Sequence, residues 1–263
     1  AHHLTHRPRE CAQSRTSETE IGRALFRAPV LFGGPTARLG LSCQSCHSSG
    51  RVNAQFFLPE LTDRAGAADV TSEWASHVRG DGIVNPVDIP DLAGVAERPS
   101  YGHGYDPSLE HFVHGVVVEE FQGAEAPQQA SASLLAYLRD LRVCTAGEEQ
   151  ITLAGAAEDV RRTLAATEHA DVATARLLLL AGQDNVARVA ERLPARRFGS
   201  ERRALEALSR GLGRLRNAGD LSAASETVLP GWRVRFDAVA ARIARRENRT
   251  YFNETTLRAA LER

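Results

Sequence analysis

The stretch that decides the fold is Leu41-Ser42-Cys43-Gln44-Ser45-Cys46-His47, with two cysteines three positions apart and a histidine directly after the second. In such a C-x-x-C-H pattern the two thiols bond to the vinyl groups of a haem, and the histidine coordinates the iron. Three positions make about one helical turn, so both sulfurs meet one edge of the porphyrin and the imidazole lies beneath the metal. The sequence therefore predicts one covalent haem c held by Cys43 and Cys46, with His47 as the proximal iron ligand.

Two other structures use a C-x-x-C pair, namely a thioredoxin-like redox site and half of a zinc site. The first requires a βαβ unit around the pair, whereas this sequence predicts helix and loop. The second requires another C-x-x-C or a zinc-type histidine pair, and neither follows Cys46. Haem attachment is therefore favoured over both.

The remaining cysteines are Cys11 and Cys144. One precedes the first predicted helix and the other ends the last helix of the same domain, so we expect a disulfide, with two free thiols as the alternative. The bridge closes a loop of over a hundred residues, which is worth about 4 to 5 kcal/mol in the chain-entropy model. Covalent haem and a disulfide both point to an oxidising compartment.

The composition is that of a globular protein, with 263 residues, 43% hydrophobic and 25% charged. The longest apolar run, 177–181, is far shorter than the roughly 20 residues of a membrane span. With 32 basic and 33 acidic residues, the chain offers no concentrated basic stripe for nucleic acid. Methionine is absent even at position 1, and every basic residue is arginine. We therefore expect a bacterial, periplasmic or otherwise exported chain that begins after a removed signal peptide.

The chain is expected to have three parts and an all-α fold. Residues 1–19 are polar and unpatterned, which predicts an N-terminal arm. Residues 20–147 are expected to form a mono-haem cytochrome c-like domain with long loops, which begins with a helix over 20–32 and ends with a helix over 133–143. Residues 148–263 are expected to form a helical bundle.

The bundle is predicted from apolar residues that recur every three or four positions. These positions are Leu153, Ala157, Val160 and Leu164, then Leu205, Leu208, Leu212 and Leu215, then Trp232, Phe236, Val239 and Ile243. Glycines and prolines punctuate the pattern, so five or six helices joined by short turns are expected. The expected breaks are Gly182, Pro194, Gly199, Gly219 and Pro230-Gly231.

The sixth iron ligand cannot be methionine, because the chain has none. The sixth position is filled by another histidine or by another group, or it is open. A filled position favours an electron carrier, whereas an open position lets small molecules reach the iron and favours an enzyme. His114 is favoured as the distal ligand, since it lies three residues after His111 on a helix predicted over 108–120. His103, in a loop flanked by glycines, is the second candidate.

Short elements in a shared order resemble the bacterial di-haem cytochrome c peroxidase superfamily, which includes the protein that matures the methylamine dehydrogenase cofactor. The resemblance covers roughly Gly22 to Leu141. Its elements are Gly22-Arg23-Ala24-Leu25-Phe26 (G-x-x-L-F), the haem segment Leu41 to His47, Ile89 to Val95 (T-P-S-L-R-N-V), Pro99 to Gly104 (P-Y-x-H-D-G), Ser108-Leu109-Glu110 (T-L-E) and the terminal helix Leu134 to Leu141.

The resemblance implies a helical haem domain with redox chemistry, and the chain departs from the family in two ways. The family carries two haem domains, each with a C-x-x-C-H, whereas this chain has one such motif. The family's high-potential haem takes Met or Tyr seven residues after the Leu of T-L-E, where this chain has Val116, which cannot ligate iron.

Three functions remain open. The leading hypothesis is electron transfer through one haem to a periplasmic redox partner protein. The alternative is a peroxidase-like or oxidase-like enzyme with an open sixth position, in which Glu119 or Glu120 supplies an acid. In the third, the C-terminal helical domain docks a partner protein through arginines such as Arg202-Arg203 and Arg245-Arg246.

Overall fold

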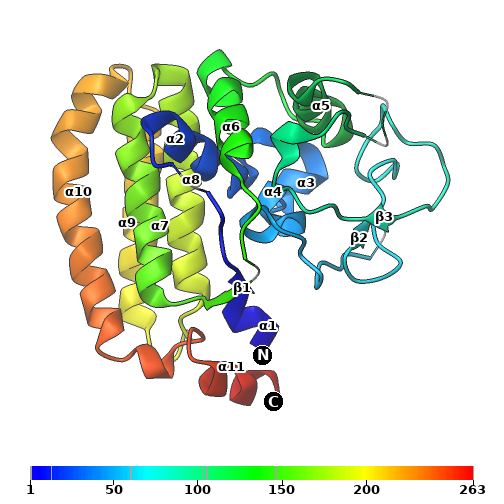
Figure 1. Ribbon diagram of the computed structural model, residues 1–263. Helices are drawn as coiled ribbons and strands as arrows, with labels where there is room; N and C mark the ends of the chain where they lie inside the picture. Colours follow the sequence, from blue (N-terminus) through cyan, green and yellow to red (C-terminus); the bar gives the residue numbers. More distant parts are fainter. Residues whose placement is uncertain are drawn as a thin grey trace. The chain divides into compact units, whose positions relative to one another are not determined.

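The computed structural model describes residues 2–12, 14–59, 61–102, 104, 106–145 and 147–262. The chain divides into two compact units. One is Pro8–Gly147, and the other joins Ala1–Arg7 to Glu148–Arg263. Helices dominate each unit, as the sequence predicts, and the described strands form only two-stranded sheets (Figure 1). No described helix has the length and apolar character needed to cross a membrane.

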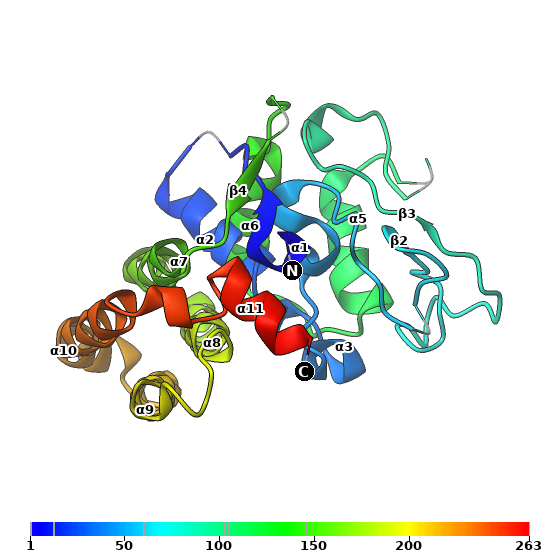
Figure 2. The ribbon, with the colours of Figure 1, turned by 90° about the horizontal axis from the view of Figure 1, so that it is seen from below.

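Four long helices form a bundle in the discontinuous unit. Each packs against the next in sequence, and the last packs back on the first, as the end-on view in Figure 2 shows. They are α7 (Leu153–Ala166), α8 (Val172–Glu191), α9 (Gly199–Arg216) and α10 (Leu221–Ala244). A shorter helix, α11, follows over Glu254–Leu261, with 3-10 turns over Thr167–His169 and Glu247–Arg249.

The apolar positions that predicted the bundle are buried in α7, α9 and α10. Two predicted breaks are wrong. Gly182 lies inside α8, where an added Cβ would come within 3.0 Å of Leu164 Cδ2, so glycine allows close packing there. Pro230 lies inside α10 although it removes a helical hydrogen bond. Burial of its neighbours Leu229 and Trp232 offsets that loss.

The start of the chain does not form the single arm predicted over residues 1–19. Helix α1 (His2–Thr5) leads into β1 (His6–Pro8), which pairs with β4 (Glu148–Gln150). The Ile151 N–H donates to the Thr5 carbonyl over 2.7 Å. Residues 2–7 therefore belong to the bundle unit, because backbone pairing ties them to the segment that enters α7.

The unit Pro8–Gly147 is built on a pair of packed helices, α2 (Ser17–Phe26) and α6 (Gln128–Asp140). Gly22 permits their contact, since a Cβ there would lie 1.9 Å from the Ser133 carbonyl oxygen. Both helices differ from the predicted ranges 20–32 and 133–143. The Thr16 side chain accepts the Thr19 N–H, and this cap starts α2 three residues early.

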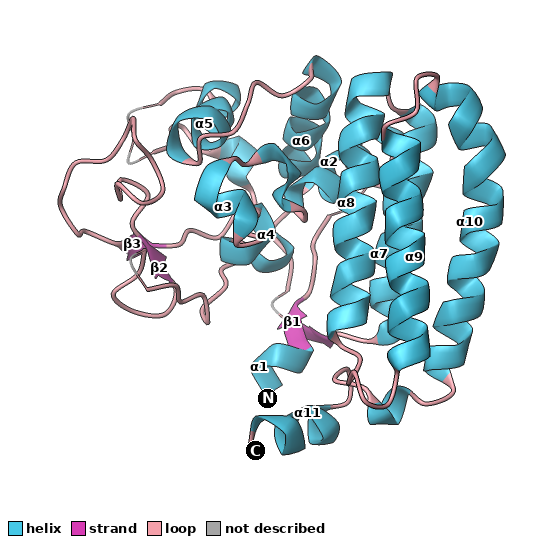
Figure 3. Ribbon diagram, turned by 180° about the vertical axis from the view of Figure 1, so that it is seen from behind, coloured by secondary structure: helices cyan, strands magenta, loops and turns pink. Residues whose placement is uncertain are grey.

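Loops connect the short elements of this unit (Figure 3). The helices are α3 (Gly34–Arg38), α4 (Cys43–Cys46) and α5 (Leu109–Gly115), which continues as a π-helix over Val116–Glu120. The strands β2 (Ala67–Ala68) and β3 (Val87–Asp88) pair antiparallel. Single 3-10 turns span Pro29–Leu31, Ser48–Gly50 and Val95–Glu97.

A disulfide joins Cys11 to Cys144, with their Cα atoms 6.0 Å apart. Beside it, the carboxylate of Glu10 accepts hydrogen bonds from Arg23 Nε over 2.9 Å and from the Tyr137 hydroxyl over 2.6 Å. Tyr137 lies in α6 and Arg23 in α2, and both are buried. The segment around Cys11 is therefore held to both helices of the pair and to the chain that follows them.

Candidate functional site

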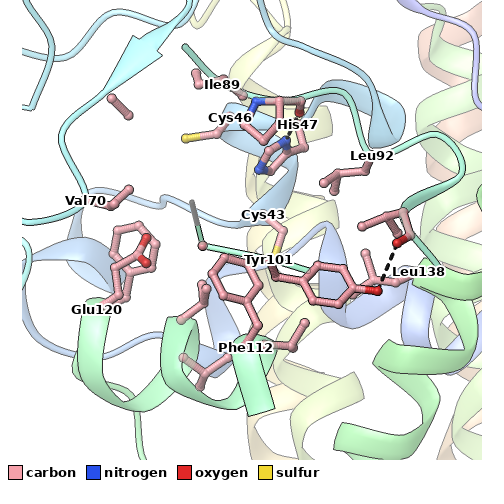
Figure 4. A pocket seen from close by; sticks show the side chains of 18 of the residues that line it. Cys43, Cys46, His47, Val70, Ile89, Leu92, Tyr101, Phe112, Glu120 and Leu138 are labelled. Atoms are coloured by element: carbon pink, nitrogen blue, oxygen red, sulfur yellow. Dashed lines mark hydrogen bonds between the residues drawn. The ribbon is translucent and has the colours of Figure 1, made fainter. Parts of the chain in front are cut away.

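A cavity of about 970 Å³ lies within the unit Pro8–Gly147, and Cys43, Cys46 and His47 contribute to its wall (Figure 4). Most of the other side chains around it are apolar. They include Phe26, Ile89, Leu92, Val116, Phe121 and Leu138. A cavity of this size and character lies at the upper end of the range of about 300–1,000 Å³ that small-molecule and cofactor sites occupy.

Helix α4 is a single turn that places the cysteines and the histidine together. The His47 N–H donates to the Cys43 carbonyl over 2.8 Å. At the other end, the Ser42 N–H donates to Ser45 Oγ over 3.0 Å. Asn53 Nδ2 donates to the Ser45 carbonyl over 2.7 Å and ties the turn to the following loop. Both cysteines therefore enter the cavity from one turn of the chain.

The imidazole of His47 is oriented by one hydrogen bond. Its Nδ1 lies 3.0 Å from the Pro90 carbonyl oxygen, which can only accept, so Nδ1 carries the proton. Nε2 then keeps its lone pair and points into the cavity (Figure 4). Burial lowers the pKa of His47 to about 4, so the ring is neutral at pH 7. Metal-ligating histidines are commonly held in this way, with the second nitrogen on a carbonyl.

The thiols of Cys43 and Cys46 are free of any disulfide. Burial raises the pKa of each to about 12, with a further rise from the charge of Glu120. Both are therefore neutral thiols at pH 7. The attacking cysteine of a redox C-x-x-C pair has instead a lowered pKa. Among the described residues, no group of three or more His, Cys, Asp or Glu is placed to hold a metal ion.

Helix α5 and the π-helix after it contribute another part of the cavity wall. Val116, at the position where the resemblance would place a ligand, lines the cavity. Phe112 lies beside Tyr101, with ring centroids 5.9 Å apart, and the Tyr101 hydroxyl donates to the Val95 carbonyl over 3.1 Å. This part of the wall is thus aromatic and aliphatic, and π-helical segments of this kind are frequent at functional sites.

Glu120 is the buried acid of the cavity. Its side chain is drawn at the cavity in Figure 4, and the residue is 4% exposed. Burial raises the pKa of Glu120 to about 8, against the opposing effect of Arg79, whose guanidinium donates to its carboxylate over 3.2 Å. Glu119, predicted beside it as an alternative acid, is 46% exposed and binds the same arginine over 3.0 Å. Only Glu120 of this pair lines the cavity.

The favoured distal ligand, His114, is not among the residues that line the cavity. Its Nε2 lies 2.9 Å from both carboxylate oxygens of Glu125, and its side chain is half exposed. His111 does line the cavity, but its Nδ1 bonds to Asp106, which raises the pKa of His111. The second candidate, His103, lies outside the described residues.

Two arginines line the cavity that the sequence did not single out, Arg79 and Arg98. Arg98 donates to the Asp91 carbonyl, next to the residue that holds His47, and Arg79 binds Glu119 and Glu120. Guanidinium groups bind carboxylates, so a ligand with acidic groups finds partners at these positions. No sequence pattern marks either arginine, because each reaches the cavity from a loop.

Comparison with protein families, with curated proteins and with solved structures gives no match for this chain.

Proposed function

We propose that the unit Pro8–Gly147 is a mono-haem cytochrome c domain, in which Cys43 and Cys46 hold haem c through thioethers and His47 is the proximal iron ligand. The observation that carries this proposal is the orientation of His47 by Pro90, with Nε2 directed into the cavity that both cysteines line. The apolar lining fits the porphyrin, and Arg79 and Arg98 fit its propionates.

Bound haem supplies a one-electron redox centre. The residues of this chain set its surroundings. The carbonyl of Pro90 keeps His47 in one tautomer and makes it a stronger ligand. The apolar wall excludes water. The reduction potential of the haem would depend on this exclusion and on the residues that ligate its iron. We infer electron transfer between partner proteins as the leading function, in the oxidising compartment that haem attachment and the disulfide favour.

A second candidate is a peroxidase-like or oxidase-like enzyme with an open sixth position. The buried carboxyl of Glu120 favours it, because an acid with a pKa of about 8 holds and releases a proton near neutral pH. Val116 favours it too, since a side chain that cannot ligate lines the cavity there. In this candidate Glu120 moves the proton, and Arg79 fixes its carboxylate.

The first experiment expresses the full chain in a bacterium that matures c-type cytochromes and stains for haem after denaturing electrophoresis. Wild type and Ser48→Ala, a matched change next to the motif, are expected to keep the stain. His47→Ala tests the proximal ligand, and loss of the native absorption spectrum is expected. A protein that carries no haem in this host contradicts the cytochrome proposal.

The second experiment records optical and low-temperature EPR spectra of the oxidised protein, and then adds cyanide, or carbon monoxide after reduction. Low-spin iron that takes up neither ligand supports the electron carrier. High-spin iron that binds both supports the enzyme, and Glu120→Gln is then expected to slow peroxide consumption, with Glu119→Gln as the control.

A further inference from the structure

The bundle unit carries a groove between α9 and α10, with a volume of about 500 Å³. Both helices belong to one compact unit, so the groove is complete within it. None of its described lining residues lines the cavity around Cys43, so a ligand in the groove does not require haem.

The floor of the groove is apolar and made of small residues. Ala204, Ala207 and Gly211 follow one another at helical spacing along α9, and Ala238 contributes from α10. Trp232 closes the floor and is 1% exposed, with Nε1 donating to the Leu208 carbonyl over 2.9 Å. Small side chains at such a surface let the backbone of a third helix approach closely.

The charge around the groove has one sign. Arg214, Arg235 and Arg242 line it, and none of its described lining residues is acidic. The guanidinium groups of Arg214 and Arg235 make no hydrogen bond or ion pair with the described part of the chain. Arg242 donates to the Ala238 carbonyl of its own helix over 3.3 Å. Exposed guanidinium groups beside an apolar floor complement carboxylates, which accept two hydrogen bonds from each.

The arginine runs that the sequence suggested for docking are partly engaged inside the bundle. Arg202 donates to the carbonyls of Ala190 and Leu193 over 2.7 and 2.9 Å, where α8 ends. Arg246 binds Glu201 over 2.6 Å. These contacts are structural, so Arg202 and Arg246 are engaged inside the bundle, whereas Arg214, Arg235 and Arg242 line the groove.

The spacing of the cations selects an elongated ligand. Arg235 and Arg242 are seven positions apart on α10, which is two turns and about 10 Å. A ligand with one anionic head reaches one of them. A helix laid along the groove, with acidic residues two turns apart, reaches both and sets its small apolar residues on the floor. We propose that the α9–α10 groove binds an acidic amphipathic helix of a partner protein.

The test uses the whole 263-residue chain, with or without bound haem, and a fluorescent synthetic helix. The peptide carries Glu at positions i and i+7 with Ala and Leu between them on the same face, and a control peptide has Gln for each Glu. Binding is measured by fluorescence anisotropy at low ionic strength. The variants are Arg235→Glu with Arg242→Glu, which reverses the charge, and Ala238→Trp, which fills the floor. The control Arg196→Glu changes an exposed arginine in the turn before α9.

We expect the acidic peptide to bind wild type and Arg196→Glu equally, and the charge-reversal variant roughly tenfold or more weakly. Ala238→Trp is expected to weaken binding too, with circular dichroism showing that each variant is folded. Equal binding of the Gln peptide, no effect of the groove variants, or no binding at about 1 mM peptide overturns the proposal. If the protein co-sediments with anionic vesicles but does not bind the peptide, the ligand is a lipid surface and the proposal is wrong.

Discussion

The two units fill their interiors differently. The bundle closes its core with its own side chains, such as Leu179, Phe198 and Phe236, each at most 1% exposed. The unit Pro8–Gly147 arranges its apolar side chains around a cavity of about 970 Å³ and connects them by loops. The comparison teaches that the bundle fills its core by packing, whereas the other unit combines an open interior with a disulfide, so we expect its stability to depend more on covalent links and on a bound ligand.

The largest expected effect comes from removing the two cysteines of the proposed haem attachment. Cys43→Ala with Cys46→Ala is expected to abolish covalent haem and to remove the cooperative unfolding of the unit Pro8–Gly147, because the cofactor stabilises only the folded state. The bundle is expected to unfold as before. Thermal melts followed by circular dichroism and, in a Trp74→Phe background, by the fluorescence of Trp232 separate the two transitions. A shift of the bundle transition as large as that of the other unit contradicts independent stability.

The next largest expected effect is a loss of stability in the bundle core. Phe236→Ala removes a buried ring that stacks on Trp232 with centroids 5.3 Å apart, and it is expected to cost about 3–5 kcal/mol of unfolding free energy. Val234→Ala, on the same helix but 69% exposed, is the control and is expected to change stability by about 0.5 kcal/mol at most. Urea denaturation measures both, and an altered haem spectrum in Phe236→Ala would contradict separate cores.

Removing the disulfide is expected to have a somewhat smaller effect, confined to the other unit. Cys11→Ser with Cys144→Ser frees a loop with a sequence separation of 133. The expected cost is about 2–4 kcal/mol, below the roughly 4 to 5 kcal/mol of the chain-entropy model, because unfolded chains keep residual structure. Reduction of wild type with a thiol is expected to reproduce the loss, since it opens the same link. If the double variant keeps wild-type stability, the contacts of Glu10 with Arg23 and Tyr137 hold the segment without the bridge.

The expected effect that is smallest for a single step of one pH unit is a pH dependence of stability from Glu120. Burial raises its folded pKa to about 8 from a usual value of 4.5, so the folded state keeps a proton that the unfolded state releases. The stability that this proton gives is fully present below about pH 4.5 and is lost as pH rises through about 8, at up to about 1.4 kcal/mol per pH unit. Glu120→Gln is expected to remove that slope from urea titrations.

The matched control for this titration is Glu119→Gln, because Glu119 binds the same arginine from a half-exposed position. It is expected to keep the slope of wild type. A slope that survives in Glu120→Gln shows that another group carries the pH dependence.

The sequence predicts the bundle well, because its helices bury side chains at regular spacing. Leu205, Leu208 and Leu212 of α9 are buried as the pattern requires. The failures at Gly182 and Pro230 have a shared cause. Local propensity marks both as breaks, but packing on either side of each residue outweighs it.

The candidate site is predictable only where it is local in sequence. Cys43, Cys46 and His47 lie in one turn, so their spacing places them together. The Pro90 carbonyl and the Arg79 guanidinium reach the cavity from loops far along the chain, and no short pattern encodes those paths. The direction of His114 depends on Glu125, which the helix spacing alone cannot reveal.

The pairing of β1 with β4 affects the order in which the protein is completed during synthesis. Residues 2–7 are synthesised before the unit Pro8–Gly147, whereas Glu149 and Asp159, which bind Arg7 over 2.7 and 3.6 Å, are synthesised after it. At translation rates of about 5–20 residues per second, this interval lasts roughly 7 to 30 s. The bundle unit therefore combines residues made before the unit Pro8–Gly147 with residues made after it, and β1 can pair with β4 only once both are made.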